Sequence, residues 1–272
     1  MTGPWREVGD RVFVRRYSEW HGEAFDQNAG VVLGADGALV VDTRGSHRLA
    51  DALIAELREL TRLPIVAVVN THHHWDHSWG NARFLPAPIW GHVRCGPRML
   101  ERSADARDQV VAAWPPLTAE LTEVVVTPPT NTIEESGIID LGDRQVELRY
   151  LGLGHTDNDI LAIVPDASVL FAGDLLEDDA PPSVGDAYPV AWAATVARIM
   201  PMASGAVVPG HGTVGGRSFV ERQVGEFALL AELGRDVVAD AIGLEEAIRR
   251  SPFPAEVTAT AIDRTRLELA EE

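Results

Sequence analysis

The sequence contains no lysine, a single cysteine and no long apolar run. Without lysine, the chain has no ammonium group to act as a nucleophile, to form a Schiff base or to hold a substrate carboxylate. Its cysteine, Cys95, cannot form an intramolecular disulfide. No stretch approaches the roughly 20 apolar residues that cross a bilayer, and the first residues lack the apolar core of a signal peptide. We therefore expect a cytoplasmic protein that does not bind membranes.

Basic residues are scarce relative to acidic ones. Arginine supplies all 23 Lys and Arg residues against 41 Asp and Glu, and the net charge is -18. Such a surface repels phosphate backbones, so we expect a small-molecule substrate and no nucleic-acid partner.

Short aliphatic runs alternate with helical patterns, which predicts an α/β fold. Residues 28–43 indicate two strands joined by a glycine-containing turn, and residues 46–62 a helix with Ser46 as its N-cap. Further strands are predicted within 63–70, 144–159, 166–179 and 205–212, and a helix from Arg217 onward. Because no low-complexity linker divides the chain, we predict one domain, residues 1–235, with a helical extension, residues 236–272, packed on it.

The segment THHHWDHSWGN, residues 71–81, follows a predicted buried strand and is rich in histidine. His72 and His74 alternate, so on an extended backbone they project to the same side, as two ligands of one ion must. Asp76 and His77 follow at once and can turn toward a second ion. Imidazole nitrogen and carboxylate oxygen suit zinc, and they also suit iron or manganese.

Three later apolar runs also lead into a residue that can bind a metal: His155, Asp174 and His211. Ends of strands in α/β sheets hold functional groups without burying them. If Asp174 lies between the other ligands, its two oxygens can bridge two ions. An isolated His-x-His pair is typical of an exposed strand, but this ordered series favours a metal centre.

The motifs HHHWDH (72–77), GHT (154–156), FAGD (171–174) and PGHG (209–212) resemble, in this order, those of the metallo-β-lactamase fold hydrolases. The resemblance covers roughly residues 10–235. It implies an αββα sandwich of two mixed β-sheets flanked by helices, with the metals at one edge between the sheets. It further implies that the first ion is bound by His72, His74 and His155, the second by Asp76, His77 and His211, and that Asp174 bridges them.

Departures from the family pattern narrow the expected chemistry. The β-lactamases of the family often have a cysteine where this chain has Asp174, and some hold the substrate carboxylate with a lysine. A bridging aspartate instead resembles hydroxyacylglutathione hydrolases, lactonases and phosphodiesterases. Glyoxalase II proteins usually read GHTPG after the third ligand strand, whereas this chain reads GHTDND at 154–159. Glutathione-thioester hydrolysis is therefore not favoured.

These observations lead to the hypothesis of a metal-dependent hydrolase with two divalent ions, zinc being favoured over iron and manganese. A hydroxide that bridges the ions, oriented by Asp76 as the catalytic residue, would cleave a small ester, thioester, lactone or amide without a covalent intermediate. The alternatives are an iron-dependent oxidoreductase resembling the persulfide dioxygenases, a β-lactam hydrolase and a noncatalytic metal-bound scaffold. The complete ligand set argues against a scaffold.

Other polar residues near the motifs have structural interpretations. We expect His73 to face solvent or contact the ligands from outside, and Asp42 to lie behind the histidine loop. Asp157 and Asp159 either cap a turn, which is favoured, or orient imidazoles. The remaining histidines are assigned to a strand-to-helix turn (His92) and to the surface (His21 and His47).

Two loops and two tryptophans are expected to shape specificity. The acidic, proline-rich segment 175–189 follows Asp174 directly and is predicted to border the mouth of the site, where its charge suits neutral or cationic substrates. Residues 114–135 are interpreted as an insertion that forms a lid or a dimer contact, which leaves a homodimer open. Trp75 and Trp79 either wall the site or, as favoured, pack in the core.

Overall fold

The computed structural model describes residues 4–20 and 23–270, and two β-sheets form its centre. The first sheet has seven strands in sequence order: β1 (Arg6–Gly9), β2 (Val12–Trp20), β3 (Glu23–Leu33), β4 (Ala38–Val41), β5 (Ile65–Val69), β6 (Ile89–His92) and β7 (Asn131–Ile133). The second has five strands in the order β12 (Ala206–His211), β11 (Val169–Glu177), β10 (Ile160–Val164), β9 (Gln145–Tyr150) and β8 (Ser136–Asp140). Both sheets mix parallel and antiparallel pairs.

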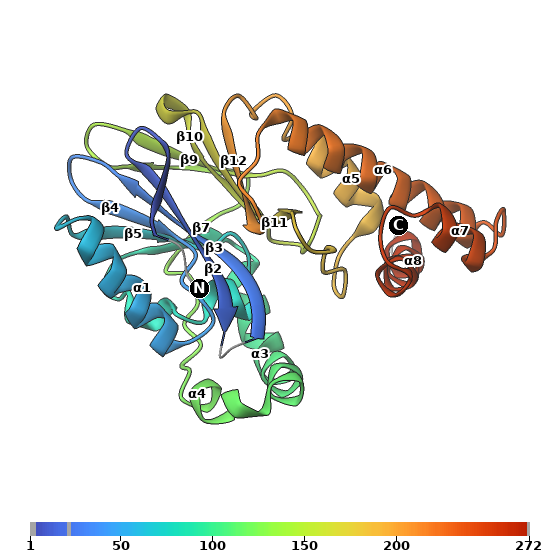
Figure 1. Cartoon of the computed structure of the whole chain (residues 1–272), viewed down its shortest axis with the longest axis horizontal. Coiled ribbons are helices and arrows are strands. Elements are labelled where there is room, and N and C mark those ends of the chain that lie inside the picture. Colours follow the sequence, from blue (N-terminus) through green and yellow to red (C-terminus); the bar gives the residue numbers. More distant parts are fainter. Residues whose placement is uncertain (1–3, 21–22, 271–272) are drawn as a thin grey trace.

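Helices cover the outer face of each sheet, so the predicted αββα architecture is confirmed (Figure 1). On the first sheet, α1 (His47–Leu60) buries Leu53 and Leu57 against strand residues such as Val40 and Val68. On the second, α5 (Pro189–Ala197) and α6 (Arg217–Val238) pack over β10 to β12 through an apolar cluster that contains Trp192. Aliphatic side chains of both sheets form the layer between them.

The elements predicted from the sequence occur close to their expected positions. The helix predicted over 46–62 is α1, and its first turn is capped by Ser46, whose Oγ accepts a hydrogen bond from the backbone N–H of Leu49 at 3.2 Å. The strand pair predicted within 28–43 is β3 and β4, which join at the Leu33–Ala38 pair. Strands β5, β9, β11 and β12 lie within the other predicted segments.

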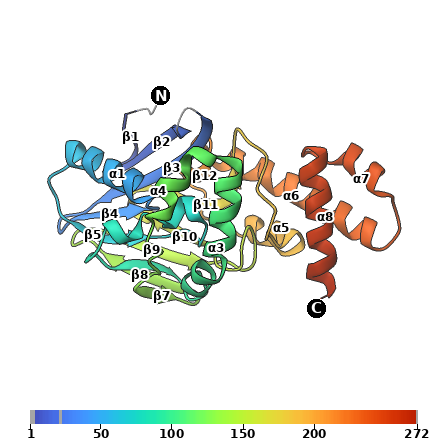
Figure 2. The same ribbon diagram turned by 90° about the horizontal axis from the view of Figure 1, so that it is seen from below.

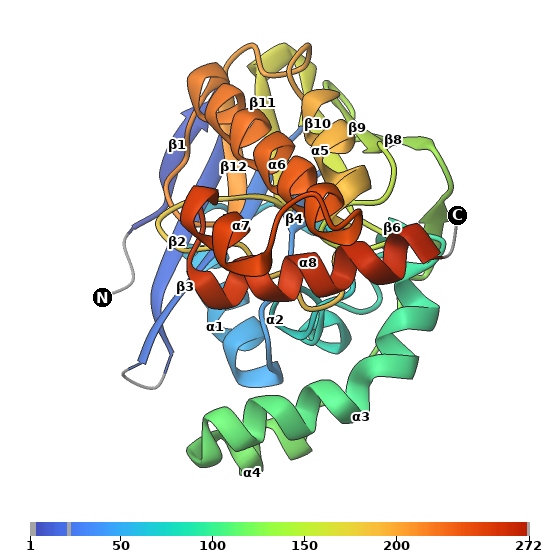
Figure 3. The same cartoon turned by 90° about the vertical axis from the view of Figure 1, so that its right-hand side faces the viewer.

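The C-terminal part of the chain is helical and lies at one end of the molecule (Figures 2 and 3). It consists of the end of α6, α7 (Leu244–Arg250) and α8 (Ala255–Ala270), and α8 contacts α5 and α6. Division of the chain after residue 235 stays a prediction. Within the described residues, no helix is both long enough and apolar enough to cross a membrane.

The segment 114–135 contains regular structure. Helix α3 (Cys95–Ala113) precedes it, and the segment itself forms a 3-10 turn (Pro115–Leu117), α4 (Thr118–Thr122) and the edge strand β7. Leu117 and Leu121 pack against Trp79. The segment therefore supports the histidine loop from outside, while its interpretation as a lid or dimer contact stays a prediction.

Candidate metal centre

The predicted ligands come from both sheets and converge on one cavity. His72 and His74 lie in the loop after β5, Asp76 and His77 in the short helix α2 (Trp75–Ser78), His155 between β9 and β10, Asp174 in β11 and His211 at the end of β12. The structure brings them together in two groups. We call His72, His74, His155 and Asp174 the first group, and Asp76, His77 and His211 the second group.

The setting of Asp174 differs from the prediction that its strand ends there, because β11 continues to Glu177. The strand is irregular one residue before Asp174, at Gly173. Gly173 has φ of +53°, a Cβ there would meet the Thr71 side chain at 2.6 Å, and the pairing with β12 shifts register at this point. On the opposite strand, a Cβ at Gly210 would lie 1.7 Å from Oδ1 of Asp174. Glycine at both positions leaves room for the carboxylate.

In each group the donor atoms face one another. Each residue of a group offers one ligand atom, and these atoms all lie within 4.8 Å of one another. In the first group, Nε2 of His155 is 2.9 Å from Nδ1 of His74. In the second, Nε2 of His77 is 3.2 Å from Nε2 of His211. Asp174 lies between the groups, since its Oδ1 is 3.3 Å from Nε2 of His77 and its Oδ2 is 3.6 Å from Nε2 of His155.

Acceptors on the outer nitrogens orient the imidazoles of the first group. Nδ1 of His155 donates to the backbone carbonyl of Ser183 at 3.0 Å, and Nε2 of His74 donates to both carboxylate oxygens of Asp186 at 3.2 Å. A neutral imidazole carries one N–H. The lone pairs of His155 Nε2 and His74 Nδ1 therefore face each other, and this pair of nitrogens needs a cation between them.

Asp42 orients two further rings from behind the histidine loop, as expected. Its Oδ2 accepts from Nδ1 of His77 at 2.8 Å and from the hydroxyl of Thr71 at 2.9 Å, while its Oδ1 accepts from the Thr71 N–H. The oxygen of Thr71 in turn lies 3.1 Å from Nδ1 of His72. Both rings thus direct Nε2 toward the ligand groups.

The carboxylates of Asp76 and Asp174 place negative charge next to the imidazoles of the second group. Burial would lower the pKa of His77 and His211, but Asp174 and Asp76 raise both pKa values well above the ordinary value. Nδ1 of His211 also donates to the backbone carbonyl of Asp26. Burial would raise the pKa of Asp76 and Asp174, but the imidazoles hold both well below the usual range. The second group therefore stabilises positive charge.

In the first group, two imidazoles have lowered pKa values and one has a raised pKa. Burial lowers the pKa of His72 well below the ordinary value, and burial together with His74 lowers the pKa of His155 to about 4. His74 differs, because Asp186 overcomes burial and raises its pKa to about 9. Two rings thus offer lone pairs, and the third lies where a positive charge is stabilised.

The donor set fits metal ions better than protons. Nε2 of His72 makes no hydrogen bond to any residue in 4–20 or 23–270. A proton between His74 and His155 would satisfy two atoms, whereas a divalent ion satisfies every donor of the first group. Nitrogen and carboxylate oxygen suit zinc, iron or manganese, and the buried thiol of Cys95 belongs to neither group. The groups are able to bind metal, and ligation by these seven side chains stays a prediction.

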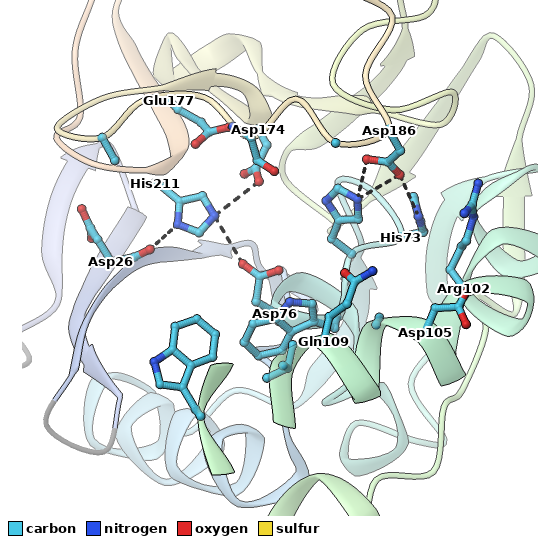
Figure 4. Close-up of a pocket in the computed structure, with 18 residues that line it drawn as sticks. Asp26, His73, Asp76, Arg102, Asp105, Gln109, Asp174, Glu177, Asp186 and His211 are labelled. Atoms are coloured by element: carbon cyan, nitrogen blue, oxygen red, sulfur yellow. Dashed lines mark hydrogen bonds and ion pairs between the residues drawn. The ribbon is translucent and has the colours of Figure 1, made fainter. Parts of the chain in front are cut away.

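The two groups open into a cavity of about 570 Å³ (Figure 4). Trp75, Trp114 and Val110 supply apolar surface on its walls. Its acidic lining, apart from the ligands, consists of Asp26, Asp105, Glu177 and Asp186. Arg102 is the arginine that lines it. Segment 175–189 therefore borders the cavity as predicted, through Glu177, Ser183 and Asp186.

The other acidic and histidine residues singled out in the sequence lie around the ligands. His73 is buried, and its Nδ1 lies 3.0 Å from the side-chain nitrogen of Asn158. Asp159 caps the turn after His155 by accepting from the N–H of Thr156 at 2.6 Å. Asp157 instead pairs with Arg98 at 3.0 Å.

The remaining singled-out residues have structural roles. His92 ends β6, at the turn that leads to α3. Its ring stacks on that of Tyr150, with 4.1 Å between the ring centroids. Nε2 of His47 accepts from the N–H of Val125, while His21 lies outside the described residues. Trp79 is buried in the core and Trp75 lines the cavity, so each of the two interpretations holds for one tryptophan.

Of the outer acceptors, Asp42 was expected from the sequence, whereas Ser183, Asp26 and Asp186 were not. Ser183 and Asp26 act through backbone carbonyls, which carry no sequence signal. Asp186 lies in the predicted mouth segment among other acidic residues. Its later position, beyond the Pro-rich stretch and before the next helix, is the one feature that sets it apart.

Comparison with known proteins agrees with this geometry. The sequence model of the metallo-beta-lactamase superfamily matches residues 22–233. The chain belongs to this superfamily. Members of the superfamily are metal-dependent and mostly hydrolases. A metallo-beta-lactamase from Pontibacter korlensis aligns with a TM-score of 0.66 at 19% identity, covering 84% of this chain and 99% of its own.

Curated relatives of this superfamily member differ in the substrates that their names state. The type 2 metallo-beta-lactamase of Bacillus cereus is 26% identical over 205 residues, which cover 73% of this chain and 72% of that protein. A linear primary-alkylsulfatase from a Pseudomonas species is 27% identical over 68% of this chain and 42% of its own length. The acyl-coenzyme A thioesterase MBLAC2 of Homo sapiens is 28% identical over 64% of this chain and 66% of its own.

Proposed function

We propose that this superfamily member is a two-metal hydrolase of a small ester, thioester, lactone or amide, with zinc as its metal. The observation that carries the proposal is the orientation of the imidazoles. Each has its outer nitrogen beside a hydrogen-bonding oxygen and its inner nitrogen directed into one of two groups that adjoin at Asp174. Two divalent ions bound there would activate water as a nucleophile at neutral pH and polarise the bond that it attacks.

Asp76 is the side chain to which we assign the orientation of the nucleophile. It lines the cavity, and its Oδ2 lies 3.1 Å from Nε2 of His77 and 3.3 Å from Nε2 of His211. An ionised carboxylate accepts hydrogen bonds and does not donate them, and the imidazoles keep the pKa of Asp76 low. Asp76 can therefore hold a water molecule with one O–H directed at the carboxylate and a lone pair directed at the substrate.

The cavity walls support an uncharged or cationic substrate with an apolar part. Trp75, Trp114 and Val110 offer apolar contacts, whereas Asp26 and Asp105 place negative charge on the lining. A polyphosphate next to the reacting bond would be repelled by these carboxylates.

Hydrolysis by the metal-loaded chain tests the proposal. The metal-stripped chain, the zinc-loaded chain and the iron-loaded chain are each assayed with an aryl ester, an acyl thioester, a lactone, a chromogenic cephalosporin and an alkyl sulfate. We expect zinc-dependent hydrolysis of an ester, thioester or lactone, and a loss of about 100-fold to 1,000-fold in kcat for Asp76→Ala. Asp51→Ala, which removes an exposed carboxylate that pairs with Arg83, is the control and should retain kcat within about threefold.

Three results would redirect the assignment. Hydrolysis of the cephalosporin alone would identify a β-lactam hydrolase, the activity named for the Bacillus cereus relative. Oxygen consumption with a persulfide by the iron-loaded chain, without hydrolysis by the zinc-loaded chain, would support the oxidoreductase alternative. Accumulation of an acyl-enzyme would contradict direct attack by water.

A further inference from the structure

We propose that the C-terminal helix α8 positions the metal ligand His74, through Arg264, Glu268 and the loop that carries Asp186. The inference rests on the metal centre of the proposed function but on no particular substrate. The match to the superfamily ends at residue 233, so α8 lies outside the matched region. Helix α8 thus contributes this contact from outside the matched region, whereas Asp186 lies inside it.

Asp186 is the contact between the loop and the first group. Its carboxylate oxygens both lie 3.2 Å from Nε2 of His74, and one lies 3.6 Å from Nε2 of His73 (Figure 4). The position of this carboxylate fixes which nitrogen of His74 carries the proton and which way the ring faces. Nδ1 of His74 then points at His155.

Arg264 holds the backbone on which Asp186 is carried. Its Nε donates to the carbonyl of Ala187 at 2.9 Å, and its guanidinium also donates to the carbonyl of Asp186 at 3.3 Å. The guanidinium lies 5.7 Å from the ring centroid of Tyr188. A single half-buried side chain of α8 thus contacts three consecutive loop residues.

Glu268 holds the other end of the same loop, where α5 begins. Its two carboxylate oxygens accept the N–H groups of Val190 and Ala191 at 2.9 and 2.8 Å. These N–H groups belong to the first turn of α5, which has no partners for them within the helix. Glu268 follows Arg264 by four positions, so both project from the same face of α8. Figure 3 shows α8 beside α5 and α6.

The loop also contacts the second imidazole of the first group. Nδ1 of His155 donates to the carbonyl of Ser183, and the N–H of Tyr188 donates to the carbonyl of Gly154 at 2.9 Å. Helix α8 therefore contacts one loop, and that loop contacts two imidazoles of the first group. The outer nitrogens of the second group face Asp42 and the carbonyl of Asp26, which belong to neither α8 nor this loop. The inference predicts that changes in α8 weaken metal binding at the first group alone.

Zinc titration of variants that isolate each group tests this inference. In a His211→Ala background, where zinc binding reports mainly the first group, we expect Arg264→Ala to weaken zinc binding by about tenfold and Asp186→Ala by about 10-fold to 100-fold. In a His72→Ala background, which reports the second group, Arg264→Ala should change affinity by less than about twofold. Arg266→Ala is the matched control, because Arg266 lies on the same helix, is exposed and pairs with Asp263.

A double-mutant cycle and a conservative variant complete the test. If Arg264 acts through Asp186, Arg264→Ala adds no further loss of zinc affinity in the Asp186→Ala chain. Arg264→Lys keeps the charge but not the two-carbonyl geometry and should fall between wild type and Arg264→Ala, which covers the case that the alanine variant does not fold. Equal zinc affinities for wild type and Arg264→Ala at the first group, or equal losses at both groups, would overturn the inference. A folded wild-type chain that binds no zinc would overturn the proposed function as well.

Discussion

The two ligand groups differ in what holds them from outside. In the first group, the outer nitrogens of His74 and His155 contact a loop, through Asp186 and the carbonyl of Ser183. In the second, His77 contacts Asp42 directly after β4, and His211 contacts the carbonyl of Asp26 within β3. Asp26 lies in β3, which pairs with β2 in this part of the strand, and the N–H of Asp42 donates to the carbonyl of Val69 in β5. A loop depends instead on a few tertiary contacts. The second group should therefore be the more rigid of the two.

The largest effect is expected from a substitution that displaces Asp174, the residue that lies between the two groups. In Gly210→Ala, the new Cβ would lie 1.7 Å from Oδ1 of Asp174, so the carboxylate must leave its position between the groups. We expect both ions to be lost, with hydrolysis reduced by at least about 100-fold. Elemental mass spectrometry of the purified variant measures the metal content.

Gly225→Ala is the control for that substitution. A Cβ at Gly225, in α6, meets nothing within 4 Å. It should keep both ions and raise the free energy of unfolding by about 0.5 to 1 kcal/mol, since alanine favours the helix. A Gly210→Ala chain that retained both ions would show that Asp174 does not join the groups.

The next effect is larger at the second group, because Asp42 contacts His77 directly and reaches His72 of the first group only through Thr71. Asp42→Ala removes the acceptor of His77 and leaves the N–H and hydroxyl of buried Thr71 without this partner. We expect second-ion affinity to fall by about 10-fold to 100-fold and the free energy of unfolding to fall by about 2 to 5 kcal/mol. Zinc titration and chemical denaturation measure the two quantities.

Asp51→Ala provides the comparison for Asp42→Ala, because Asp51 is exposed and pairs only at the surface with Arg83. It should leave zinc affinity unchanged. If Asp42→Ala weakened binding of the first ion more than binding of the second, the distinction between a first group held by a loop and a second group held by the sheet would be wrong.

The smallest expected effect appears in the wild-type chain. When a chelator is added in excess, we expect the ion of the first group to leave about tenfold faster than that of the second. Opening of the loop between β11 and α5, residues 178–188, would release the partners of two imidazoles. Stopped-flow release of cobalt, used as a spectroscopic substitute for zinc, separates the two phases. A single phase, or slower release from the first group, would contradict the comparison.

Much of the fold and the ligand groups could be predicted because both depend on local patterns. Buried strands such as β5 and β12 appear in the sequence as aliphatic runs. His72 follows β5 and His211 ends β12, and both are easily recognised as polar residues next to an aliphatic run. The αββα sandwich itself followed from resemblance of the motifs, and the superfamily match confirms it.

Apart from the contact of Asp42, the outer contacts could not be predicted, because they join residues that are far apart in the chain. The contact between Asp186 and His74 joins the loop after β11 to the histidine loop. Arg264, in the last helix, contacts Ala187. The lack of room for a Cβ at Gly173 likewise depends on the Thr71 side chain in the loop after β5. Periodicity reports which face of an element is buried, but it does not report which distant group lies against it.

Anomalous X-ray diffraction from crystals of the zinc-loaded chain, measured on both sides of the zinc absorption edge, tests the central claim most directly. The account predicts two zinc peaks, one among His72, His74 and His155 and one among Asp76, His77 and His211, with Asp174 next to both. Zinc bound only elsewhere, or no peak at these residues in crystals grown with excess zinc, would contradict the assignment of the metal centre.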